Sequence, residues 1–110
     1  MKQYVIDEIR LNDYKKLKEY FNKNYKQTSP IGIYWIPLEE SILTEEQKKH
    51  TNCQPLYFAL DITENQISSE FLIRSPNTLK CNCIAYASEY QRNWLINHID
   101  SILNELEISA

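Results

Sequence analysis

The segment LYFALDITENQISSEFLIR, residues 56–74, contains two runs of alternating apolar and polar side chains joined by a short polar stretch. The first run places apolar side chains at positions 56, 58, 60 and 62, and the second places them at 67, 71 and 73. Alternation with a period of two is typical of strands that bury one face. The polar residues 63–66 between the runs favour a turn. We therefore predict an antiparallel β-hairpin with one face against the core.

The segments on either side of the hairpin predict the remaining elements of an α+β domain. The elements follow one another in the order strand, helix, strand, short helices, three strands, helix. This order favours one domain over residues 1–110, with a mostly antiparallel sheet of about five strands and two long helices packed on one face. The further strands are expected at 3–9, 31–37 and 79–86, the long helices at 13–25 and 89–106, and the short helical pieces within 38–52.

Three helix starts carry capping signals. Asn12 precedes the first helical pattern, where its side-chain oxygen is expected to accept a hydrogen bond from a free backbone N–H group. Thr44 with Gln47, and Ser88 with Gln91, have the spacing of a capping box. In that motif each side chain bonds to the backbone N–H group of the other residue. We expect a helix to begin directly after each of these caps.

Composition limits the classes of function. The chain has 110 residues, one glycine and a net charge of −3. A single glycine excludes the glycine-rich loops that hold phosphates or dinucleotides, and the acidic balance argues against a groove for nucleic acid. No apolar run approaches the ~20 residues of a membrane span, and residues 1–16 lack the apolar region of a signal peptide. We therefore expect a small soluble cytoplasmic protein without a nucleic-acid or membrane partner.

Two pairs of possible metal ligands occur, His50 with Cys53 and Cys81 with Cys83. One histidine and three thiolates make an accepted zinc site. On an extended strand, however, Cys81 and Cys83 share one face with Cα atoms about 6.5 Å apart, which differs from a preformed zinc knuckle. That face is apolar, and a thiol there behaves as a small hydrophobic group. Buried free cysteines are the favoured interpretation, and a zinc-stabilised small domain is the alternative.

A thiol enzyme is a further alternative, and it requires a base. His98 lies at the border of the apolar stripe of the last predicted helix. If that helix covers the cysteine face, His98 would approach Cys81 or Cys83 and lower the pKa of a thiol. The chain shows no HExxH motif, P-loop or Ser/His/Asp pattern. We assign no catalytic, cofactor-binding or metal-ligating residue, and the sequence favours a protein that is not an enzyme.

Aromatic side chains provide the leading hypothesis for function. Tyr34 and Trp35 are adjacent on a predicted strand, so only one of them faces the core. An exposed apolar patch on the second sheet face would mark a partner surface, often that of a homodimer, unless the short helices at 39–50 cover it. We therefore expect a binding or accessory module that contacts a protein partner or a second copy of itself. The candidate patch comprises Tyr34 or Trp35, with Tyr57, Leu72, Ile84 and Tyr86.

Overall fold

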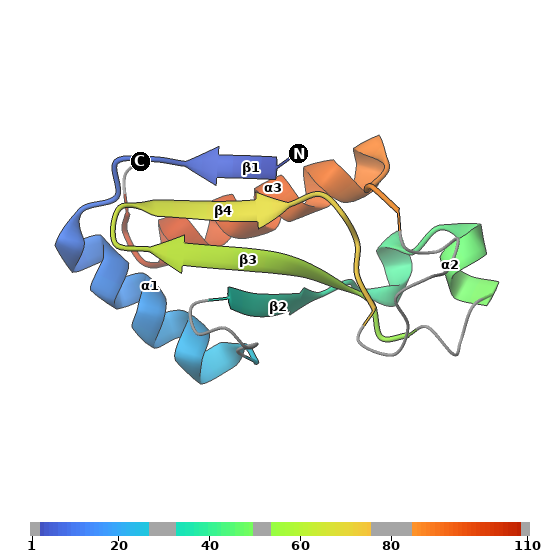
Figure 1. The fold of residues 1–110 in the computed structure, drawn as a ribbon, viewed down its shortest axis with the longest axis horizontal. Coiled ribbons are helices and arrows are strands. Elements are labelled where there is room, and N and C mark those ends of the chain that lie inside the picture. The colour runs from blue at the N-terminus through green and yellow to red at the C-terminus, as the bar shows by residue number, and fades with distance from the viewer. Residues whose placement is uncertain (1–2, 27–32, 50–53, 76–84, 109–110) are drawn as a thin grey trace.

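The predicted hairpin forms the centre of a four-stranded antiparallel sheet (Figure 1). The computed structural model describes residues 3–26, 33–49, 54–75 and 85–108. Within them the sheet order is β1–β4–β3–β2, and every neighbouring pair is antiparallel. The α+β class and the antiparallel sheet are thus confirmed for a single domain. The strands are β1 (Gln3–Ile6), β2 (Ile33–Pro37), β3 (Tyr57–Thr63) and β4 (Gln66–Glu70).

Strand register sorts the side chains into a buried face and an open face. Tyr34 lies opposite Leu60, and Leu60 lies opposite Ser69, so these three side chains share one face across three strands. All three are fully buried. The predicted alternation within the hairpin is therefore confirmed. The buried face of the sheet comprises Tyr34, Ile36, Phe58, Leu60, Ile62, Ile67 and Ser69.

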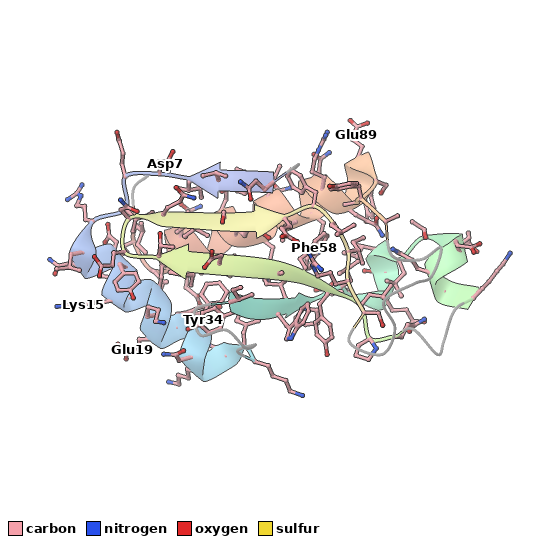
Figure 2. The ribbon with its side chains drawn as sticks, in the orientation of Figure 1. Asp7, Lys15, Glu19, Tyr34, Phe58 and Glu89 are labelled. Carbon is pink, nitrogen blue, oxygen red and sulfur yellow. The ribbon has the colours of Figure 1, made fainter. Side chains whose placement is uncertain are left out.

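Two long helices cover this buried face. They are α1 (Leu11–Asn24) and α3 (Glu89–Glu105). Phe21 of α1 contacts Tyr34 with ring centroids 5.5 Å apart, and Trp94 of α3 stacks on Phe58 at 6.4 Å. Since Tyr34 and Phe58 belong to the same sheet face (Figure 2), both helices pack on that side. None of the helices among the described residues has the length and apolar composition that a membrane span requires.

The start of α1 corrects the prediction that Asn12 caps it. The helix begins at Leu11, and Arg10 occupies the capping position without a side-chain hydrogen bond. The connection from β1 turns sharply at Glu8, whose φ angle is 60°, and the backbone N–H group of Ile9 donates to Asn65 O at 2.9 Å. Ile9 is buried. Tertiary contacts before the helix therefore set its start, whereas the cap signal in the sequence is local.

Both predicted capping boxes are confirmed. In the first, Thr44 N donates to Gln47 Oε1 at 3.0 Å, and Gln47 N donates to Thr44 Oγ1 at 3.2 Å. The corresponding distances between Ser88 and Gln91 are 3.0 and 3.2 Å. The first box opens α2 (Glu45–Lys49), which follows a short 3-10 helix, η1 (Glu40–Ile42). The second opens α3.

The hairpin strands differ from the prediction at their far end. Leu60 pairs with Ser69, and Tyr57 pairs with Arg74. These pairs are three positions apart on β3 but five positions apart on the other strand. Two extra residues therefore bulge out of the ladder, which ends β4 at Glu70 rather than at residue 74.

The prediction of about five strands is also corrected. Residues 76–84, which include most of the expected strand at 79–86, lie outside the described residues. Where the chain is described again, Ile73 N donates to Ala85 O at 3.0 Å and Ala87 N donates to Phe71 O at 2.7 Å. These bonds flank a single antiparallel bridge between Leu72 and Tyr86. In the described part of the chain the sheet therefore has four strands, with one bridge at its end.

Candidate binding surface on the open sheet face

The sheet face opposite the long helices carries the residues that the sequence suggested for binding. We define the open face by Trp35, Tyr57, Leu72 and Tyr86. The first three are partly exposed, and Tyr86 is 49% exposed. None of the four belongs to the hydrophobic core or packs against it. These side chains therefore contribute apolar surface to the outside of the domain.

The aromatic centre of the open face is the pair Trp35 and Tyr57. Trp35 lies opposite Ala59, and Tyr57 lies opposite Pro37, so the two aromatic residues are diagonal neighbours on β2 and β3. Their ring centroids are 5.2 Å apart, with 44° between the ring planes. The choice that the sequence left between Tyr34 and Trp35 is settled by burial, because Tyr34 is fully buried in the core.

The described short helices do not lie over this pair. In Figure 1, α2 lies beyond one end of the sheet, and η1 contacts α3. A buried polar link holds them there, because Gln91 Nε2 donates to Ile42 O at 2.9 Å and to Gln47 Oε1 at 2.8 Å. The alternative in which residues 39–50 cover the aromatic face is therefore wrong for the described part of that segment.

An ion pair borders the open face next to Tyr57. Arg74 bonds to one carboxylate oxygen of Glu70, with Nε at 3.1 Å and Nη2 at 2.8 Å. Both donors point at the same oxygen, so the guanidinium is held in place and its charge is balanced locally. Ile84, which the sequence also assigned to the patch, lies outside the described residues. The described surface thus combines an aromatic centre with a neutralised polar rim.

A small cavity opens where the chain leaving α1 passes the outer edge of β2. Its volume is about 190 Å³, and Trp35 and Tyr57 form one side of it. Trp35 N donates to Lys26 O at 3.0 Å, which fixes the chain after α1 along this edge. The sequence pointed to the aromatic pair but not to the other side of the cavity. The remaining lining residues are Asn24, Tyr25, Lys26 and Pro37.

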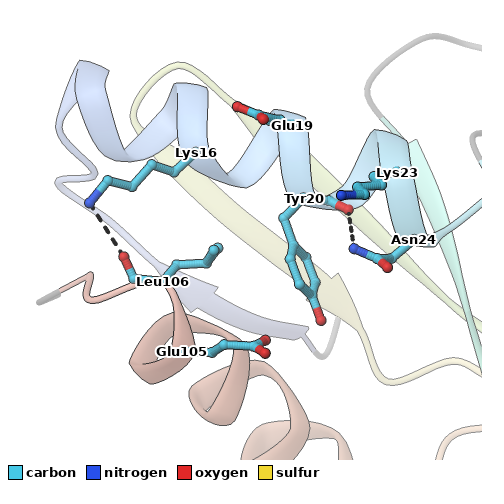
Figure 3. A pocket seen from close by; sticks show the side chains of 7 residues that line it. All are labelled: Lys16, Glu19, Tyr20, Lys23, Asn24, Glu105 and Leu106. Atoms are coloured by element: carbon cyan, nitrogen blue, oxygen red, sulfur yellow. Dashed lines mark hydrogen bonds between the residues drawn. The ribbon is translucent and has the colours of Figure 1, made fainter.

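A second hollow, of about 540 Å³, lies between α1 and the end of α3 (Figure 3). Lys16 Nζ donates to Leu106 O at 3.3 Å across it. Burial raises the pKa of Tyr20, and the carboxylate of Glu105 adds to that rise. Two lysines and two glutamates line the hollow, so it has no net charge with which to select a ligand. The charged residues are Lys16, Lys23, Glu19 and Glu105.

His98, the proposed base of a thiol enzyme, lies in an aromatic cluster. Its Nε2 is hydrogen bonded to the Tyr25 hydroxyl at 2.7 Å, and its ring stacks on Trp94 with centroids 4.8 Å apart. Burial lowers the pKa of His98, and the negative charge of Glu39 partly opposes this. Burial also raises the pKa of Tyr25 to about 12, with smaller contributions from Tyr20 and from the carboxylate of Glu105. His98 is thus a packed side chain with one ring nitrogen already hydrogen bonded.

The cysteine and zinc hypotheses fall on residues that the structure does not describe. His50, Cys53, Cys81 and Cys83 all lie outside the described residues, so both the zinc site and the buried thiols stay predictions. Among residues 3–26, 33–49, 54–75 and 85–108, no group of three or more histidine, cysteine or acidic side chains is arranged to hold a metal.

The environment of His98 predicts a pH dependence of stability. Because its pKa is lower in the folded state, the unfolded chain binds the proton more readily. The free energy of unfolding should therefore fall as the pH drops below about 6.5, the ordinary histidine value, through the lowered folded pKa. Urea denaturation at a series of pH values measures this. A His98→Gln variant, which cannot titrate, should lose that part of the dependence, and an unchanged pH profile would contradict the assignment.

Comparisons of the chain with protein-family models, curated proteins and solved structures found no match.

Proposed function

We propose that this protein is a non-enzymatic binding module whose working surface is the open face. One observation carries the proposal: two large aromatic side chains, Trp35 and Tyr57, lie side by side on a sheet face that no described helix covers. Neither ring contributes to the core. A role in contacting another protein accounts for their place on the surface, since tryptophan and tyrosine are enriched at the energetic centres of interfaces.

Physical chemistry supports a partner for this surface. Burying apolar area against a second protein is favourable by roughly 25 cal/mol per Å², so partly exposed rings are stabilised by being covered. The neutral Arg74–Glu70 pair and the polar positions on β4 would form the polar rim that surrounds most interface centres. The partner is either a different protein or a second copy of this chain.

Site-specific photo-cross-linking tests the proposal. A photoreactive phenylalanine analogue placed at Tyr57 should give one discrete adduct in cells that naturally produce the protein, because a specific partner covers that ring. The same analogue at Tyr90, which is 65% exposed on α3, the helix that packs on the opposite face of the sheet, is the matched control and should give none. Mass spectrometry of the adduct identifies the partner, and light scattering of the purified protein reports whether it is a second copy.

A second protein variant tests whether the adduct formed from position 57 depends on the aromatic pair. A Trp35→Ser change should reduce the adduct formed from position 57 by about tenfold, as expected when a residue at the energetic centre of an interface is removed. Equal mixtures of adducts from positions 57 and 90, or none from position 57, would contradict a binding role for the open face.

A further inference from the structure

The outer edge of β2 is closed to a partner strand. Trp35 N points away from β3, and it is already bonded to Lys26 O. Pro37 is two residues further on, with the same orientation, and it has no N–H group to donate. Adding a strand to a sheet edge requires backbone donors at such alternate positions. A segment that binds at this edge must therefore be recognised through side chains and not through a β-ladder.

The cavity at this edge offers aromatic faces and hydrogen-bond donors. Trp35 and Tyr57 present rings inclined at 44° to each other, beside the ring of Pro37. Within the described residues neither Trp35 Nε1 nor the Tyr57 hydroxyl has a hydrogen-bond partner. Both groups are therefore open to an acceptor brought by a ligand.

Lys26 is the one charged side chain in the described lining of the cavity. Its described lining contains no carboxylate, and the ammonium group of Lys26 makes no ion pair with any described residue. Aromatic cages also bind quaternary ammonium groups, but a neighbouring lysine repels such a ligand. Lys26 instead favours a ligand with an acidic side chain close to the cavity.

We propose that this cavity binds a proline-rich segment of a partner protein in the polyproline II conformation, with an acidic residue next to the prolines. A polyproline II segment has no internal hydrogen bonds, so its carbonyl oxygens are free to accept from Trp35 Nε1 and the Tyr57 hydroxyl. Its proline rings pack on aromatic faces, and its preformed shape lowers the entropic cost of binding. This inference rests on the proposed function, because it specifies the partner of the same surface.

Titration of ¹⁵N-labelled protein with a synthetic peptide tests the inference by NMR. The probe is a run of about six prolines, long enough for two turns of polyproline II, flanked by glutamates. The indole N–H signal of Trp35 should shift in proportion to peptide bound. A peptide with alanines in place of the prolines should bind at least about tenfold more weakly, because it loses the preformed shape. Replacing the glutamates by lysines should also weaken binding, and added salt should reduce that difference.

Protein variants locate the site. Trp35→Ala and Tyr57→Ala should each weaken peptide binding by about tenfold or more, and Tyr90→Ala should leave it unchanged. Peptide binding that survives both open-face variants, or equal binding of the alanine peptide, would overturn the inference. The inference would also be overturned if tetramethylammonium shifted the Trp35 signal and the proline peptide did not. If position 57 still cross-links to a protein while the proline peptide fails to bind, the binding function stands and only the choice of ligand is wrong.

Discussion

A Gln91→Glu substitution is expected to lower the free energy of unfolding by about 3 kcal/mol, although it preserves the size of the side chain. Gln91 is only 1% exposed, and its Nε2 donates to both Ile42 O and Gln47 Oε1. Glutamate would place an oxygen against these two acceptors. The cap of α3 itself should survive, because glutamate is an accepted residue at this position of a capping box. Urea denaturation of the two proteins measures the difference.

The pH dependence of this loss of stability shows whether it comes from the buried carboxyl group or from the cap of α3. A protonated carboxyl retains one donor, so the destabilisation should be smallest below about pH 4.3 and should increase as the pH rises above it. Ser88→Ala is the matched control, since it removes only the local cap and should cost about 1 kcal/mol at every pH. A loss for Gln91→Glu no larger than that of the control would show that the link to Ile42 and Gln47 contributes little.

Local patterns predicted the hairpin and both capping boxes, because each depends on residues close together in the chain. Alternation at positions 56–62 specifies which side of β3 is buried, without reference to any other element. The spacing of Thr44 and Gln47, and of Ser88 and Gln91, likewise specifies bonds within one helical turn. The sequence was therefore most informative for elements whose interactions join residues that are close together in the chain.

Contacts between distant segments explain what the sequence did not predict. The two capping boxes are joined through Gln47 and Gln91, which are 44 residues apart, and no local pattern indicates this pairing. The start of α1 is set by the bond from Ile9 to Asn65, so the plausible cap at Asn12 is not used. The bulge before Arg74 lies beside the bridge between Leu72 and Tyr86, which is also a contact that no local pattern indicates.

The candidate surface was only partly predicted, because part of it depends on contacts between distant segments. Strand alternation showed that Tyr34 and Trp35 face opposite ways, and that Tyr57 faces away from the core. It did not show which of Tyr34 and Trp35 is buried, because that depends on which side the helices pack. The far side of the cavity, formed by Tyr25 and Lys26, depends on the path of the chain after α1 and had no signal in the sequence.

The neighbours Tyr34 and Trp35 therefore provide the sharpest test of the arrangement. Tyr34→Ala is expected to lower the free energy of unfolding by about 3–5 kcal/mol, since it empties a fully buried site against Phe21. Trp35→Ala should cost only about 1 kcal/mol, largely the contact with Tyr57, although it removes a larger side chain. Urea denaturation of both variants gives the comparison.

If Tyr34→Ala lowers the free energy of unfolding so far that no folded protein remains, Tyr34→Phe provides the comparison. That variant keeps the ring and removes only the hydroxyl that donates to Asn22 Oδ1, so it should lose about 1 kcal/mol and stay folded. Equal losses for the two alanine variants would mean that Trp35 is buried as deeply as Tyr34, and the open face would then be a second core layer. With the expected inequality, the ring of Trp35 is dispensable for folding, and a loss of binding in Trp35→Ala can be assigned to the surface itself.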